Sequence, residues 1–212
     1  MKTRSLSEFF MRRFHAARLK KFVNFMRVTA ATPILDVGGT EFDWRLLPFQ
    51  PKVVLLNQQL DGARTRVPWV IGDACKLPFA DQSFPVVYSN STIEHLFTEE
   101  NQRLAASEIR RVGRGYFVQT PNRWFPVEPH YLAPLIHYLP KRWQRRLLRN
   151  FTVWGILSRP SQELCDRDID EIRLLSVADM KKLFPDAMII RERFLGMTKS
   201  ILAVRVPSQE SS

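Results

Sequence analysis

Two short stretches of the chain combine an acidic residue with a glycine at most two positions away, and a ligand could be held there. The first is the apolar run Ile34–Val37, which contains Asp36. The second, about one βαβ unit further on, contains Gly72 and Asp73. Apolar runs of this kind are typical of buried parallel strands, whose carboxyl ends meet at one edge of the sheet. We therefore expect both acids at that edge, bracketing a polar ligand that carries hydroxyl and amine groups.

A third stretch places an acid two residues before a histidine. Glu128, Pro129 and His130 follow the fifth predicted strand, and proline keeps such a segment extended. A carboxylate that holds an imidazole can orient it as a general base toward an acceptor hydroxyl. Two alternatives stay open. The pair could supply two metal ligands, although no further ligand cluster in the sequence supports a metal. The segment could also be a rigid lid whose polar groups fix only its own shape.

Strand and helix signals alternate along the chain, which is typical of an α/β fold. Between residues 57 and 67 a crossover helix barely fits, so we expect a shortened helix or a loop there. The pattern predicts a Rossmann-like, seven-stranded, mostly parallel sheet whose last strand is antiparallel, with an N-terminal helix and an insertion after strand five. The expected strands are 34–37, 52–57, 67–71, 84–89, 115–119, 187–194 and 199–206, and the expected helices are 5–28, 98–111 and 176–184.

Together these motifs resemble the class I S-adenosylmethionine-dependent methyltransferases, particularly the small type 11-like branch. The resemblance runs at motif level from about Pro33 to Phe97 and more loosely to Val206. It implies S-adenosylmethionine as the cofactor and methyl transfer as the activity. The residues that carry it are Asp36, Gly38, Gly72–Ala74, Leu77–Phe79, Asp81, Ser83, Phe84 and Ile93–His95.

The resemblance also implies which residues bind the cofactor. The loop of Gly38 and Gly39 would hold its methionine and ribose portions, and Asp73 would accept a hydrogen bond from the adenine amino group. Ser89 ends the fourth strand beside the place of methyl transfer. The full set of cofactor-binding candidates is Asp36, Gly38, Gly39, Asn57, Asp73, Ala74 and Ser89.

The chain departs from the family pattern at two places. Thr40 and Phe42 stand where the later glycines of the first loop would fall. Asn57 takes the place of the acid that usually grips the ribose hydroxyls, and an amide lacks the charge that strengthens such bonds. Asp61 would serve instead if the second strand ended later. As a further possibility, Asn57 is only a turn former.

The positive charge of the chain is concentrated in two segments. The net charge is +11, and residues 1–28 and 141–149 carry all of the excess. The apolar, aromatic run 135–140 leads into the second segment, a composition typical of an element on an anionic lipid interface. Nucleic acid is the less favoured partner because no RNA- or DNA-binding module is visible. We therefore expect the protein to bind an anionic membrane surface through residues 1–28 and 135–149.

The 212 residues fit one domain with elaborations. We expect a basic helical extension over 1–32, a methyltransferase domain over 33–206 with an acceptor-binding insertion at 120–168, and a polar tail over 207–212. Two cysteines are too few for a disulfide framework, and no apolar run is long enough to span a bilayer. These features predict a cytoplasmic protein, peripheral at the inner membrane face.

The expected reaction is O-methylation of a small or a lipid- or glycan-linked acceptor, with N- and C-methylation left open. His130 is the preferred base, Glu128 orients it, and His95 lies near the sulfonium by resemblance, although a packing role for His95 is equally plausible. No metal is expected. The alternatives are a non-catalytic methyltransferase-like module that docks on an anionic membrane or partner, and an RNA methyltransferase.

Overall fold

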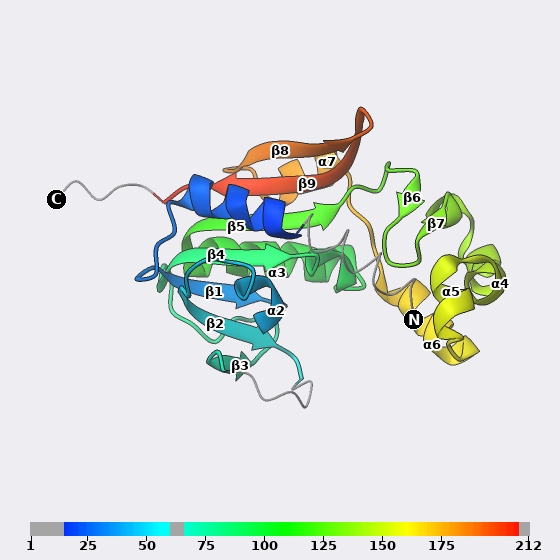
Figure 1. Cartoon of the computed structure of the whole chain (residues 1–212), viewed down its shortest axis with the longest axis horizontal. Coiled ribbons are helices and arrows are strands. Elements are labelled where there is room, and N and C mark those ends of the chain that lie inside the picture. Colours follow the sequence, from blue (N-terminus) through cyan, green and yellow to red (C-terminus); the bar gives the residue numbers. More distant parts are fainter. Residues whose placement is uncertain (1–14, 60–65, 208–212) are drawn as a thin grey trace.

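The computed structural model describes residues 15–59 and 66–207, and its centre is a seven-stranded sheet (Figure 1). The strand order is β3-β2-β1-β4-β5-β9-β8. Strands β1 to β5 are parallel, and β9 is antiparallel to both of its neighbours. The predicted fold class is therefore confirmed. The strands are β1 (Pro33–Val37), β2 (Lys52–Asn57), β3 (Trp69–Ile71), β4 (Phe84–Asn90), β5 (Gly113–Pro121), β8 (Met188–Phe194) and β9 (Met197–Arg205).

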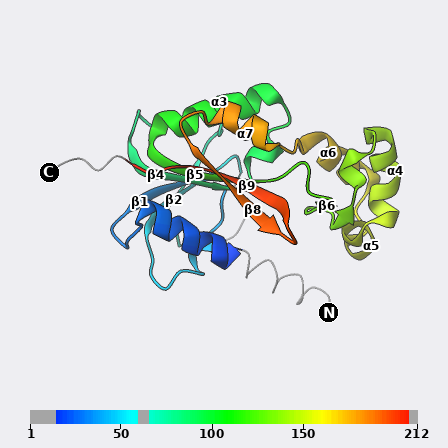
Figure 2. The ribbon, with the colours of Figure 1, turned by 90° about the horizontal axis from the view of Figure 1, so that it is seen from above.

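Helices cover both faces of this sheet (Figure 2). Helices α3 (Glu99–Val112) and α7 (Val177–Leu183) lie on one face, while a helix over residues 15–26 lies on the other. The short α2 (Glu41–Trp44) follows β1 and also packs on the second face through Trp44. Successive residues of β1 point to opposite faces, so Leu35 joins the core under α3 and Ile34 joins the core under the N-terminal helix.

The helix over 15–26 is an integral part of the second core. Leu19, Phe22 and Met26 recur at helical spacing and are buried against the sheet. Full burial of one such side chain contributes about 1.5–3 kcal/mol. This packing contrasts with the extension expected over 1–32, because the described part of that segment belongs to the core of the domain. Residues 5–14 of the predicted helix lie outside the described residues.

Arg18 ties this helix to the carboxyl ends of the central strands. Its guanidinium is buried and donates to Asn90 Oδ1 at 2.6 Å and to Gln119 Oε1 at 2.9 Å. It also forms an ion pair with Glu192 at 3.1 Å. The network therefore fixes the ends of β4 and β5, beside which the candidate site is built.

Three elements end at residues suited to caps or turns. Ser176 caps α7 in a reciprocal capping box with Asp179. Gly113 stands at the C-terminal cap of α3. The β8–β9 hairpin turns at Gly196, whose φ of +79° is a backbone conformation that favours glycine. The described residues between β2 and β3 contain no helix, while residues 60–65 of that connection lie outside the described residues.

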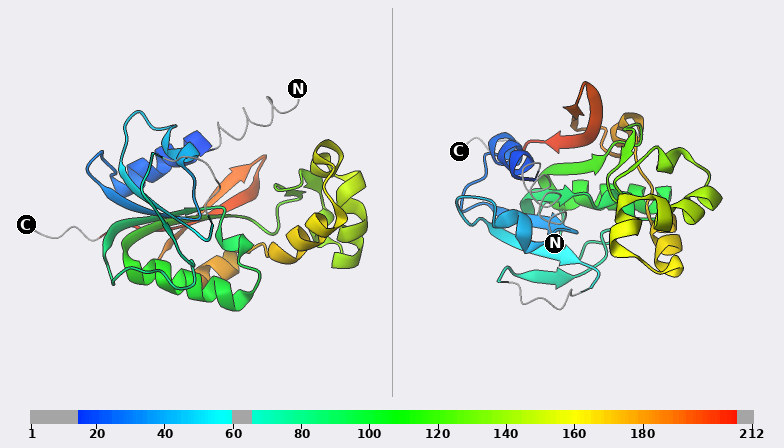
Figure 3. Two further views of the ribbon diagram at one scale, coloured as in Figure 1. Left: turned by 90° about the horizontal axis from the view of Figure 1, so that it is seen from below. Right: turned by 45° about the vertical axis from the view of Figure 1, so that its right-hand side comes forward.

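The segment after β5 forms a lid with its own small core (Figure 3). The lid leaves the sheet near Asn122 and returns near Leu175, and these two residues form an isolated parallel bridge. The bounds expected from the sequence, 120–168, cut through α6, because Cys165 and Ile169 of that helix are buried in the lid core. The lid contains β6 (Val127–Glu128), β7 (Ala133–Pro134), η2 (Ile136–Tyr138), α4 (Lys141–Phe151), α5 (Val153–Ser158) and α6 (Gln162–Glu171).

Within the described residues, no helix combines the length and the apolar character needed to cross a bilayer.

Candidate active site

A cavity of about 430 Å³ lies at the carboxyl ends of the parallel strands. Five of the candidate cofactor-binding and catalytic residues contribute to its lining: Gly38, Asn57, Asp73, Ala74 and His95. They come from the end of β2 and from the segments that follow β1, β3 and β4, as expected where parallel strands end together. The two acid-and-glycine stretches therefore do meet at one edge of the sheet, although only one of the two acids faces the cavity.

The first loop is shaped by Gly38. This residue has φ of +77°, and a Cβ there would lie 2.2 Å from Thr92 Cγ2. Thr92 cannot easily move, since it is β-branched and its hydroxyl donates to the Val37 carbonyl at 3.1 Å. Glycine at position 38 thus allows the loop and Thr92 to form one continuous wall of the cavity.

Asp36, Gly39 and Ser89 are absent from the cavity lining. Asp36 is fully buried and accepts from Trp44 Nε1 at 2.8 Å, and its burial raises the pKa of the carboxyl well above its ordinary value. Gly39 passes so close to Asp36 that a Cβ would lie 1.8 Å from Oδ2. Ser89 donates to the Val37 carbonyl at 3.1 Å. The three residues support the loop from behind, and direct cofactor contact by them stays a prediction.

Asn57 both lines the cavity and holds the first loop. Its side-chain amide donates to the Gly39 carbonyl at 3.0 Å. An acid at this position could not donate that bond, which is a physical reason for the amide. The alternative residue, Asp61, lies outside the described residues.

Asp73 turns the chain at the end of β3. Its Oδ1 accepts from the Cys75 backbone N–H at 2.9 Å. Burial, together with the nearby Asp73 carboxylate, raises the pKa of the Cys75 thiol to about 11. The thiol is therefore protonated at neutral pH and is a poor nucleophile.

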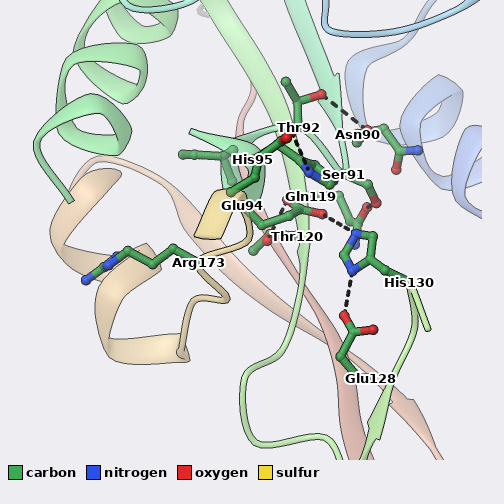
Figure 4. Close-up of polar contacts among 12 residues, drawn as sticks. Asn90, Ser91, Thr92, Glu94, His95, Gln119, Thr120, Glu128, His130 and Arg173 are labelled. Carbon is green, nitrogen blue, oxygen red and sulfur yellow. Dashed lines mark hydrogen bonds and ion pairs between the residues drawn. The ribbon is translucent and has the colours of Figure 1, made fainter. Parts of the chain in front are cut away.

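The lid brings His130 to the edge of the sheet (Figure 4). Glu128 Oε1 lies 2.5 Å from His130 Nδ1, and Glu128 Oε2 accepts from the Tyr131 backbone N–H at 2.7 Å. On the other side of the ring, Nε2 lies 4.0 Å from Glu94 Oε1. Burial alone would lower the pKa of His130, but the hydrogen bond to Glu128 and the charges of Glu128 and Glu94 outweigh it, so that the pKa is raised.

Glu94 is the site residue that the sequence did not single out for a role. It lies in η1 (Ile93–His95), is fully buried, and accepts from the Thr120 hydroxyl at 2.9 Å through Oε2. Its burial raises the pKa of the carboxyl to about 7. The signal available in the sequence was its place in the Ile93–His95 motif, beside His95.

His95 connects this cluster to the main cavity. Its ring lies 4.9 Å from that of His130, edge to face. Burial, with the neighbouring His130, lowers the pKa of His95 to about 4, so this imidazole is neutral near pH 7. A second cavity of about 220 Å³ lies under the lid, and its lining shares His95 and Glu171 with the first. Its lining also includes His130, Tyr131, Trp154 and Asp168.

The arrangement can hold two molecules side by side. The larger cavity has the size of a small-molecule site and offers backbone, amide and carboxylate groups. The smaller one presents aromatic side chains and His130. The shared wall at His95 marks where a group could pass from one molecule to the other.

Comparisons with known proteins agree with this geometry. Residues 48–118 match a family model described as a methyltransferase domain. No curated protein matches the chain. The PH0226 protein of Pyrococcus horikoshii has a similar structure, with 18% identity and a TM-score of 0.58, over 95% of this chain and 92% of that one.

Two other solved structures resemble the chain. One is a chain from a complex containing the Haloferax volcanii Trm112 methyltransferase activator, with 15% identity and a TM-score of 0.57, over 94% of this chain and 91% of that one. The other is the Haemonchus contortus phosphoethanolamine N-methyltransferase 2 in complex with S-adenosyl-L-methionine. It shares 15% identity and a TM-score of 0.52 over 82% of this chain and 37% of that one. At these identities the likeness concerns the fold.

Proposed function

We propose that this chain, which belongs to the class I S-adenosylmethionine-dependent methyltransferases, methylates a hydroxyl oxygen of a small or a lipid- or glycan-linked acceptor at an anionic membrane surface. The observation that carries the proposal is the place of His130. Its imidazole is held by Glu128 in the lining of the smaller cavity, which shares a wall with the larger one.

The larger cavity fits the cofactor. The absence of a Cβ at Gly38 would let a ligand lie close to the backbone there. In this proposal Asp73 and Ala74 hold the adenine. Asn57 contacts the ribose and keeps its hydrogen bond to the Gly39 carbonyl. When bound, S-adenosylmethionine supplies an electrophilic methyl group on a sulfonium.

The lid residues activate the acceptor. A hydroxyl placed in the smaller cavity within reach of His130 Nε2 would pass its proton to that nitrogen. The Nδ1 atom faces Glu128, which fixes the ring and stabilises the imidazolium. In its ionised form Glu94, whose carboxyl has a pKa of about 7, would add negative charge 4.0 Å from Nε2, on the side where the proton arrives. An amine or carbon acceptor would have less need of this arrangement, which is why we propose a hydroxyl.

The outer surface of the lid supports the choice of an anionic membrane. Arg142, Arg146 and Arg149 recur at spacings of four and three along α4, so they share one face, and all three are exposed. Lys141 and Arg145, in contrast, pair with Asp170. At the end of α4 and in α5 the exposed large apolar side chains are Phe151, Val153, Ile156 and Leu157. Basic and apolar groups next to each other are typical of an interfacial element on the cytoplasmic leaflet.

Vesicle sedimentation tests this surface. Replacing Arg142 and Arg146 by Gln should weaken binding to vesicles that contain anionic lipid roughly 30-fold, since each arginine near such a surface contributes about 1 kcal/mol. Replacing Arg191 and Arg193 of β8 by Gln removes the same charge from another part of the molecule and should leave binding near wild type. Equal binding to neutral and anionic vesicles, or equal losses in both double variants, would remove the membrane from the proposal.

A further inference from the structure

We propose that Glu94, His95 and His130 bind one divalent transition-metal ion. The three side chains meet where the two cavities share a wall (Figure 4). This inference goes beyond the proposed methyl transfer and does not depend on which acceptor is used. Because the ion would take the Nε2 lone pair of His130, the ion-bound form is a separate state of the site from the one in which His130 acts as the base. It also differs from the expectation drawn from the sequence, which offered only Glu128 and His130 as neighbouring ligands.

The distances are close to those of a metal site. One ligand atom from each of the three residues lies within 4.8 Å of the other two. Ligand atoms bound to a common ion at about 2.1 Å lie at most about 4.2 Å apart. Glu94 Oε1 and His130 Nε2, at 4.0 Å, already satisfy this limit. Side-chain shifts on the order of half an ångström would bring in the third ligand.

Glu94 supplies an independent indication. Its Oε1 is buried and has no hydrogen-bond partner among the described residues, whereas Oε2 accepts from Thr120. A buried carboxylate oxygen without a partner is costly, and such atoms in folded proteins often belong to an ion or a catalytic site. A cation in the cluster would satisfy this oxygen without moving Glu94.

Carboxylates behind both histidines complete the arrangement. Glu128 holds Nδ1 of His130 at 2.5 Å, which leaves Nε2 for the ion. Glu171 Oε1 lies 3.4 Å from His95 Nδ1. Carboxylates that hold the second nitrogen of a ligating histidine are a regular feature of metal sites, where they fix the tautomer and the ring orientation. Together with Asp168 they make the surroundings negative, which favours a cation.

The donor set indicates the class of ion. Two imidazoles and one carboxylate suit Zn²⁺, Co²⁺, Mn²⁺ or Fe²⁺ better than Mg²⁺ or Ca²⁺, which prefer oxygen ligands. Three protein ligands leave a coordination position open, and the smaller cavity beside His95 and His130 gives access to it. The ion and a proton would compete for the same lone pair of His130 Nε2. Metal affinity should therefore fall as the pH is lowered through the pKa of His130.

The test is a titration of the full-length protein, freed of metal by a chelator, with Co²⁺ by absorption and with Zn²⁺ by calorimetry. One ion per chain is expected. Glu94→Gln and His130→Gln should each weaken the binding of the ion at least about tenfold, and Glu128→Gln should weaken it about 10- to 100-fold. His137→Gln removes a lid histidine that lies outside the cluster and should bind like the wild type.

A cooperative thermal unfolding transition of each variant, measured in parallel, shows that its fold is intact. If Glu94→Gln fails to fold, His95→Gln takes its place. Absence of Co²⁺ or Zn²⁺ binding at pH 7.5, or undiminished binding in the cluster variants, would overturn the proposal. Neither result would bear on methyl transfer itself, which is measured without added metal.

Discussion

Replacing His130 by Gln is expected to lower the rate of methyl transfer about 10²- to 10⁴-fold, the range usual for a lost general base. Glutamine keeps a polar group of similar reach but cannot accept the proton of an acceptor hydroxyl at neutral pH. The rate can be followed as labelled methyl entering a lipid and metabolite extract. His137→Gln, a lid histidine outside the cluster, should be close to wild type.

The pH dependence separates a base from a structural role. The neutral imidazole is the active form, so the rate of the wild type should rise with pH through a pKa above the ordinary 6.5. Replacing Glu128 by Gln removes the main group that raises this pKa, while burial still lowers it. The inflection in kcat/KM should therefore move to lower pH. An unchanged inflection in Glu128→Gln, or a fully active His130→Gln, would exclude His130 as the base.

Replacing Gly38 by Ala is expected to weaken the binding of S-adenosylmethionine on the order of 100-fold, or about 2.7 kcal/mol. A Cβ at position 38 would lie 2.2 Å from Thr92 Cγ2. The free loop can relieve this overlap by moving into the cavity, but the cofactor must push it back. The measurement is calorimetric titration with the cofactor and with its demethylated product.

Gly196→Ala is the matched control for this experiment. Gly196 has φ of +79°, nearly that of Gly38, but nothing lies within 4 Å of a Cβ there. Both variants therefore place alanine in the left-handed region, which costs about 1–2 kcal/mol of stability. Only Gly38→Ala also creates a steric overlap, with Thr92. Gly196→Ala should bind the cofactor like the wild type. Binding by Gly38→Ala within about twofold of wild type would show that this loop does not hold the cofactor.

The sheet and the position of the cofactor cavity could be predicted from the sequence, because both follow from local patterns. The apolar run that contains Asp36 and the run that precedes Asp73 predict buried strands, and adjacent parallel strands end at one edge of the sheet. The direction of each side chain could not be predicted. Asp36 turns away from the cavity because Trp44, eight residues later, donates a hydrogen bond to it.

The cluster under the lid depends on contacts between distant parts of the chain. Glu94 and His130 are 36 positions apart and meet only because the lid folds back over η1. The hydrophobic periodicity of a sequence does not predict contacts between distant residues. The sequence therefore identified Glu128 and His130 as a pair and left Glu94 without a role. The end of the lid was misplaced for a related reason. The burial of Cys165 and Ile169 in the lid core, which assigns α6 to the lid, is a tertiary contact.

Incubation of the full-length protein with methyl-labelled S-adenosylmethionine and separate lipid, polar-metabolite and RNA extracts tests the proposed reaction most directly. We expect label to enter lipid-linked or small hydroxyl compounds as an O-methyl group, with little transfer by Gly38→Ala and His130→Gln. Label found only in RNA, or only on nitrogen or carbon, would contradict the proposed acceptor. No label above that of Gly38→Ala in any extract would contradict methyl transfer to these acceptors altogether.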